Sequence, residues 1–154
     1  DTVRFTSLSP YRIRVTGRTK HHINVFGEEL MVENTDQAIA KACQITQTEV
    51  VDYTVAPVFM VDKEKGAHEW IIEFKKNPAD VGLFKKVLDE TLQSLNSDYD
   101  AKRYTNMTLN PLILNVARPN FFYDWLKDQD NLVGQHKIPR LSNQRHYLAQ
   151  LKNK

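Results

Sequence analysis

Short stretches of alternating or helically spaced apolar residues follow one another along the chain. Residues 11–15 alternate apolar and charged side chains, which is typical of a half-buried strand, and residues 22–26 predict a second strand. Gly17 offers a bend between them, and Gly27 suits the turn that follows because glycine adopts unusual backbone angles. The pattern therefore predicts a β-hairpin near the N-terminus.

Two helices are predicted by apolar residues that recur every three or four positions. The first is capped by Asn34 or Thr35. Its apolar positions are Ala38, Ile39, Ala42 and Cys43. The second begins at Asn77, a cap that is followed by Pro78 at the first helical position. Its apolar stripe consists of Phe84, Leu88, Leu92 and Leu95.

The remaining periodic segments are strands and short helices. Residues 50–61 and 69–74 predict antiparallel neighbours, joined by the polar turn 62–66. Residues 112–116 predict another strand, residues 121–127 a short helix, and a last periodic segment follows Ser142. This order predicts one α+β domain over residues 1–154: a mixed, largely antiparallel sheet of about four strands, flanked by helices in a split βαβ arrangement.

Composition narrows the class of protein. The net charge is only +2, so a strong basic field for nucleic acid is not expected, and no apolar run reaches the ~20 residues that a membrane span needs. The single cysteine, Cys43, excludes an internal disulfide and suits a reducing, cytoplasmic compartment. The chain starts at Asp1 without a methionine, and we expect a further segment upstream.

Two segments combine glycine with basic residues, residues 17–30 and 134–142. By strand parity Arg18 and Lys20 share one face, where they are suited to a phosphate or carboxylate; the competing interpretation is a solvated edge strand. Lys137 lies between Gly134 and Pro139, in a loop that can move as a unit and bring a positive charge to a phosphoryl group. Composition alone favours an ordinary surface lysine.

Other kinds of site find little support. His21 and His22 are adjacent and point to opposite faces of a strand, and the other three histidines are isolated, so no metal site is expected. The chain contains no Ser-His-Asp signature and no phosphate-binding glycine loop of the Walker or Rossmann type. A self-contained active site is therefore not expected.

The motif GRTKHHINVFGEEL at residues 17–30 resembles the hinge motif that opens the C-terminal domain of adenylate-forming enzymes. The stretches AHEWIIEF (67–74), LNSDYDAKR (95–103) and GQHKIPRL (134–141) are similar to the auxin-responsive acyl acid amido synthetases, in particular to bacterial members. The resemblance covers nearly all of the chain. It implies a reaction in which ATP adenylates a carboxylate and an amine, usually an amino acid, then captures the acyl group.

The resemblance also implies roles for individual residues. Lys137 matches the lysine that approaches the α-phosphate and the substrate carboxylate, and Lys20 matches the hinge position. Arg18 matches an arginine that contacts the nucleotide, and Asp1 a ribose-binding aspartate. ATP and Mg²⁺ would be bound mainly by an N-terminal adenylation domain that this chain lacks. The fragment is therefore expected to be inactive alone.

Two other interpretations stay open at this point. A freestanding small-molecule-binding regulatory module would bind a ligand by itself, because split βαβ domains often do and fold does not fix function. A nucleic-acid binder would use Arg12, Arg14, Arg18 and Lys20 as a basic strip, and its affinity would fall steeply with salt.

Overall fold

The computed structural model describes residues 2–17, 21–59, 65–104, 108–128 and 138–153. Its elements, in chain order, are β1 (Thr2–Leu8), β2 (Tyr11–Gly17), β3 (His22–Ile23), β4 (Leu30–Met31), α1 (Val32–Thr46), β5 (Glu49–Val58), β6 (Ala67–Lys76), α2 (Val81–Leu95), α3 (Ser97–Arg103), β7 (Ile113–Ala117), α4 (Phe121–Asp128) and α5 (His146–Lys152). The expected α+β class is confirmed.

The main sheet has the order β5-β6-β7. β5 and β6 pair antiparallel, as the sequence predicted, and β7 pairs parallel to β6 after the crossover through α2 and α3. On the free side of β5, Leu141 forms an isolated parallel bridge with Val55. The mixed sheet therefore has three named strands, and a short stretch near the C-terminus extends it by one position.

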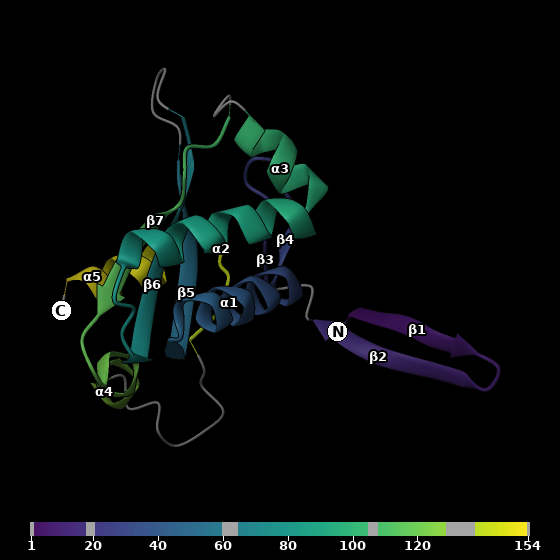
Figure 1. Ribbon diagram of the computed structural model, residues 1–154, viewed down its shortest axis with the longest axis horizontal. Coiled ribbons are helices and arrows are strands. Elements are labelled where there is room, and N and C mark those ends of the chain that lie inside the picture. The colour runs from purple at the N-terminus through teal and green to yellow at the C-terminus, as the bar shows by residue number, and fades with distance from the viewer. Residues whose placement is uncertain (1, 18–20, 60–64, 105–107, 129–137, 154) are drawn as a thin grey trace.

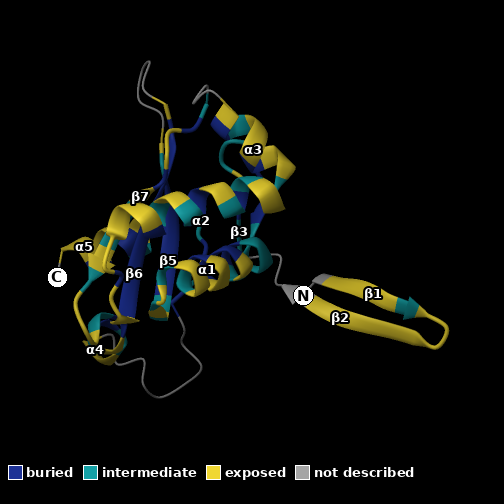
Figure 2. Cartoon of the chain, viewed as in Figure 1, coloured by how far each residue is buried: buried dark blue, intermediate teal, exposed yellow. Residues whose placement is uncertain are grey.

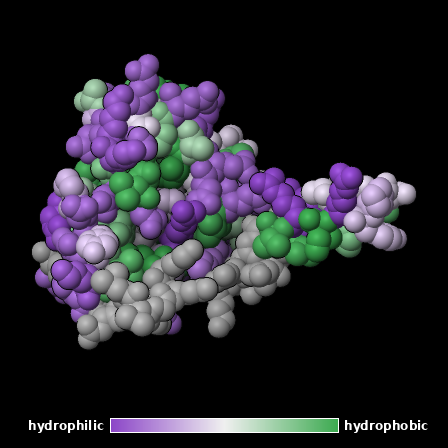
Figure 3. Space-filling view, turned by 90° about the horizontal axis from the view of Figure 1, so that it is seen from below, coloured by the Kyte–Doolittle hydropathy of each residue, from purple (hydrophilic) through white to green (hydrophobic). Residues whose placement is uncertain are grey.

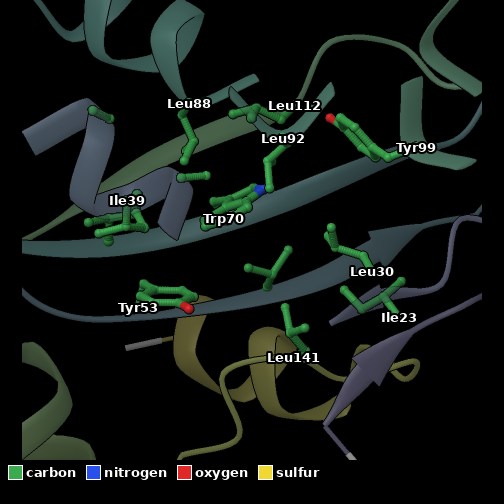
Figure 4. Packing of buried hydrophobic residues seen from close by; sticks show 14 of the residues in the cluster. Ile23, Leu30, Ile39, Tyr53, Trp70, Leu88, Leu92, Tyr99, Leu112 and Leu141 are labelled. Atoms are coloured by element: carbon green, nitrogen blue, oxygen red, sulfur yellow. The ribbon is translucent and has the colours of Figure 1, made fainter. Parts of the chain in front are cut away.

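β6 is buried on both faces, and its side chains alternate between two cores. Trp70, Ile72 and Phe74 join the larger core under α1 and α2 (Figure 4), whereas Ile71 joins a smaller core with residues of α4 and α5. Figure 1 shows α1 and α2 on one side of the sheet and α4 and α5 on the other. The result is a three-layer arrangement with the sheet in the middle.

Buried carboxylates on β6 fix the helices of the second face. Glu73 accepts hydrogen bonds from the backbone N–H of Asn120 at 2.7 Å and of Phe122 at 3.1 Å, at the start of α4. Glu69 accepts from Arg145 Nη2 and Lys152 Nζ, both at 2.6 Å, beside and within α5. These bonds let two acidic side chains be buried in the middle of the sheet, where an unpaired charge would be costly.

The two long helices begin at positions other than those predicted. α1 starts at Val32, and Asn34 acts from within the first turn, where its Oδ1 accepts from Met31 N at 3.1 Å. α2 is capped by Asp80 instead of Asn77, because Asp80 Oδ1 accepts from Leu83 N at 3.0 Å. In the predicted stripe of α2, Phe84, Leu88 and Leu92 are fully buried, whereas Leu95, in the last turn, is 38% exposed.

The N-terminal β-hairpin is present, but its strands are not the predicted pair. β2 pairs with β1 across a turn at Ser9 and Pro10, while the short β3 pairs with β4. The hairpin projects from the body of the domain, as Figure 1 shows. Residues 22–26 therefore belong to a separate ribbon that packs on the domain.

A buried ion pair joins α2 to α3. Arg103 Nη2 donates to Asp89 Oδ2 at 2.6 Å and Arg103 Nε to Asp89 Oδ1 at 3.1 Å, while the Tyr99 hydroxyl donates to Asp89 Oδ1 at 2.6 Å. Burial, followed by the negative charge of Asp89, raises the pKa of Tyr99 well above its ordinary value, so the hydroxyl remains a donor.

We expect Asp89→Ala to lower the free energy of unfolding by about 3–5 kcal/mol, because it leaves Arg103 charged and buried without its partner. Urea denaturation of the chain measures the loss. Glu90→Ala is the matched control: its side chain is exposed, 3.9 Å from Lys86 Nζ, and the change should stay within about 0.5 kcal/mol. Equal losses for the two variants would contradict a structural role for the pair.

Candidate functional site

The four residues that the sequence singled out, Asp1, Arg18, Lys20 and Lys137, lie outside the described residues. The residues that follow Lys20 and Lys137 in sequence are described, from His21 and from Ile138 onward. The geometry of the candidate site is therefore described from these two following segments. We call residues 138–143 the loop anchor. Residues 21–31, which follow the predicted hinge position Lys20, are called the post-hinge ribbon.

The loop anchor lies along the free edge of β5. Val55 N donates to Arg140 O at 2.8 Å, Ser142 N donates to Val55 O at 3.1 Å, and Thr54 Oγ1 donates to Pro139 O at 2.8 Å. Ile138 is buried in the smaller core and Leu141 in the larger one. The chain immediately after Lys137 is thus held by backbone bonds and by both cores.

An ion pair and a cation–π contact of Arg140 also hold the loop anchor in place. Its Nη1 donates to both carboxylate oxygens of Asp36, at 2.7 and 2.9 Å, and its guanidinium lies 5.3 Å from the centre of the Tyr53 ring. The Tyr53 hydroxyl donates to the same Asp36 at 2.6 Å and contacts Thr35 Oγ1 at 2.7 Å. Burial and the bond to Asp36 raise the pKa of Tyr53, which keeps this hydroxyl protonated.

The post-hinge ribbon is packed on the same edge of the domain. Ile23 and Leu30 pair across β3 and β4, and both are completely buried in the larger core. Asn143 joins the ribbon to the loop anchor: its Nδ2 donates to His22 O, and its Oδ1 accepts from Asn24 N, each at 2.9 Å. One amide side chain thus serves two backbone groups, as a neighbouring strand would.

A hollow of about 390 Å³ lies where the loop anchor meets the start of the post-hinge ribbon. It is lined by His21, Pro139, Leu141, Ser142, Asn143, Gln144 and Tyr147. The structure therefore brings the ends of the two predicted functional segments to one edge of the sheet. This proximity was not predicted, because more than a hundred residues separate the two segments in the sequence.

Sequence analysis also missed a buried pair between Glu28 and His68. Glu28 Oε1 lies 2.8 Å from His68 Nε2, Glu28 Oε2 accepts from Phe26 N at 2.7 Å, and neither side chain is exposed. His68 stacks on Tyr99 at 5.5 Å between ring centres. His68 Nδ1 has no hydrogen-bond partner within the described residues. The pair fixes the turn of the ribbon to the central strand β6.

The Glu28 carboxylate is stabilised despite its burial. Burial alone would raise the pKa of Glu28, but the hydrogen bond and electrostatic attraction from His68, with backbone N–H donors, outweigh it and lower the pKa below 4.5.

The ring of Phe26 lies directly over Gly66, where an added Cβ would come within 2.4 Å of ring atoms. The turn at Gly27 has a φ of 81°, which favours glycine.

No group of three or more His, Cys, Asp or Glu side chains within the described residues is arranged to hold a metal ion. In the same part of the chain, none of the helices has the length and apolar character of a membrane span.

These features define a three-layer α+β domain in which the loop anchor and the post-hinge ribbon meet at one sheet edge. The sequence model of the GH3 family C-terminal domain matches residues 33–146. The chain belongs to the GH3 family and carries its C-terminal domain. The same sequence finds no match among curated proteins.

Solved structures show the same fold. The GH3.15 acyl acid amido synthetase superposes with a TM-score of 0.71 at 17% identity over 97% of this chain. The AtGH3.15 acyl acid amido synthetase in complex with 2,4-DB gives 0.70 at 17% identity over 98%. In each case the match spans 29% of the other chain. The chain thus corresponds in length to less than a third of either protein.

The Glu28 pair predicts a dependence of stability on pH. The folded-state pKa of Glu28 is lowered, so its contribution to stability is present above pH 4.5 and is lost as the pH falls through the folded value. We expect the difference in free energy of unfolding between the unaltered chain and Glu28→Gln to shrink on acidification below pH 4.5, as urea titrations at several pH values would show. The control is Glu29→Gln, on the exposed neighbouring side chain. A difference that stays constant with pH would contradict the assignment.

The two hydrogen bonds of the Asn143 side chain lead to a second prediction. Asn143→Ala removes both hydrogen bonds, and we expect the Asn24 amide to exchange with solvent about fivefold faster, because a net hydrogen bond is worth roughly 1 kcal/mol. Hydrogen-exchange NMR measures the rate. Asn110→Ala, at an exposed position, should leave it unchanged. If the exchange rate of the Asn24 amide is unchanged in Asn143→Ala, Asn143 does not hold the ribbon to the loop anchor.

Proposed function

We propose that this chain is the mobile C-terminal cap of an ATP-dependent acyl acid amido synthetase. The full-length enzyme adenylates a carboxylic acid and transfers the acyl group to an amine or amino acid. Family membership supports this function, as do two similar structures that carry the name acyl acid amido synthetase. The structural observation that carries it is the loop anchor, which holds the chain firmly from Ile138 onward, directly after Lys137.

In the first half-reaction, the substrate carboxylate attacks the α-phosphate of ATP, the bond to the β-phosphate breaks, and pyrophosphate leaves. Negative charge builds up on the phosphoryl oxygens, and the ammonium group of Lys137 stabilises it. ATP enters with Mg²⁺ as substrate, held mainly by an N-terminal adenylation domain. Arg18 and Asp1 contribute contacts to the nucleotide from this chain.

In the second half-reaction, the amine attacks the acyl carbonyl, the bond to phosphate oxygen breaks, and AMP leaves. The cap rotates about Lys20 between the two steps, so that Lys137 is present for the first and withdrawn for the second. The reaction takes place in the cytoplasm, where ATP is available. Without the N-terminal domain, the chain has no activity of its own.

We expect Lys137→Ala in the full-length protein to slow adenylation by about 10²–10³-fold, the usual cost of losing one electrostatic contact to a transition state. Amide formation from preformed acyl adenylate should change only a few-fold. Pyrophosphate release and single-turnover aminolysis report the two steps separately. Lys127→Ala, at an exposed position on α4, is the charge-matched control. Equal slowing of both steps would argue against the role of Lys137.

A further inference from the structure

Asp36 accepts hydrogen bonds from two neighbouring elements at once. Arg140 Nη1 donates to both of its carboxylate oxygens, at 2.7 and 2.9 Å, and the Tyr53 hydroxyl donates to its Oδ1 at 2.6 Å. Asp36 belongs to α1, Tyr53 to β5 and Arg140 to the loop anchor. One carboxylate thus joins the helix that follows the post-hinge ribbon to a residue close after Lys137 in the chain.

The Arg140 side chain rests on a buried aromatic stack. Its guanidinium lies 5.3 Å from the centre of the Tyr53 ring, and that ring stacks on Trp70 with 5.4 Å between centres and 24° between planes. Trp70 is completely buried, and Figure 2 shows buried residues along β5 and β6 beside the partly exposed helix α1. Because side chains in a packed core keep their rotamers, the surface that receives Arg140 is fixed in place.

Exposure to water separates this ion pair from the buried pair of Asp89 and Arg103. The side chains of Asp36 and Arg140 are 45% and 44% exposed. Exposed ion pairs contribute little to global stability, and hydrophilic residues cover much of the face in Figure 3, so a surface pair by itself does not indicate function. The Asp36 pair differs by its place, because one partner belongs to the loop anchor.

Within the described residues, the loop anchor pairs with β5 at one position only. Val55 forms an isolated bridge with Leu141, through backbone bonds to the residues on either side of it. A single bridge at a sheet edge opens more readily than a long ladder, because few bonds must break together. The ion pair between Arg140 and Asp36 adds a restraint from α1 directly beside this bridge.

The chain from Arg140 back to Lys137 is short. Only Ile138 and Pro139 lie between them, and the proline ring fixes one of the backbone angles. Loosening Arg140 therefore shifts the chain that carries Lys137. A misplacement of about 1 Å at a reacting group costs up to about 10²-fold in rate, so a small shift is enough to be measured.

We propose that Asp36 is a positioning residue for adenylation: through Arg140 it fixes the loop anchor, and so sets where the ammonium group of Lys137 meets the reacting phosphate. This inference rests on the proposed function and adds to it a residue that lies 104 positions from Arg140 in sequence. Asp36 acts without touching the nucleotide. Its effect is on the rate of the first half-reaction, because only that step uses Lys137.

The first measurement is hydrogen exchange in the 154-residue chain. We expect the Val55 amide, which donates to Arg140 O, to exchange at least about threefold faster in Asp36→Ala, because the bridge loses its neighbouring restraint. Asp124→Ala is the matched control: it breaks an ion pair with Arg118 of the same 2.7 Å length and similar exposure, and it should leave the Val55 rate unchanged. An unchanged Val55 rate in Asp36→Ala would overturn the inference.

The second measurement separates the two half-reactions in the full-length protein. Asp36→Ala should lower kcat for adenylation about tenfold with the KM for ATP unchanged, because the substrate still binds but Lys137 is misplaced. Asp124→Ala should leave kcat unchanged, and aminolysis of preformed acyl adenylate should be unaffected in both variants. In a Lys137→Ala background, adding Asp36→Ala should cause no further loss, since the group that Asp36 positions is already gone.

The inference and the proposed function fail by different outcomes. An equal loss with and without Lys137 would overturn the inference, because it would show that Asp36 supports the fold in general. If Lys137→Ala slows adenylation and Asp36→Ala does not, the positioning role is wrong and the proposed function stands. If Lys137→Ala itself leaves adenylation unchanged, the proposed role of Lys137 fails, and the inference falls with it.

Discussion

The backbone pairing between Val55 and the loop anchor is the interaction on which the arrangement of the candidate site depends. β5 would otherwise present unpaired N–H and C=O groups at the edge of the main sheet. Arg140 O and Ser142 N satisfy both groups of Val55, while Ile138 and Leu141 enter different cores. Because one short stretch completes the sheet and both cores at once, its position follows from the packing of the whole domain.

The post-hinge ribbon is attached at two separate points, and this makes it rigid. Asn143 holds the β3 end through backbone groups of His22 and Asn24, and Glu28 holds the turn through His68. Glu69 and Glu73 perform a similar task for α5 and α4 on the other face of the sheet. Buried carboxylates with several donors thus connect the ribbon, α4 and α5 to β6.

The local periodicity of apolar residues was sufficient to predict the long helices and strands, but not to predict how the short strands pair. Phe84, Leu88 and Leu92 share one helical stripe, so α2 was predictable, and the β5–β6 pair followed from two apolar runs around a polar turn. The partner of β2 was not predicted, because Ser9 and Pro10 lack the Asn-Gly or Gly-rich signature of tight hairpin turns. Contacts such as Glu28 to His68 join distant positions, and no local pattern encodes them. The proposed roles of Arg18, Lys20 and Lys137 come from family resemblance. The structure describes only the segments that follow Lys20 and Lys137 in sequence.

The loop anchor also limits how Lys137 would be withdrawn between the two half-reactions that we propose. Arg140 is fixed to Val55 and Asp36, and three residues of fully extended chain span at most about 10–11 Å. However the loop itself moves, the backbone of Lys137 stays within that distance of Arg140. A larger displacement must therefore come from rotation of the whole cap. The only stretch between the hairpin and the ribbon is residues 18–20, and that is where the proposed hinge at Lys20 lies.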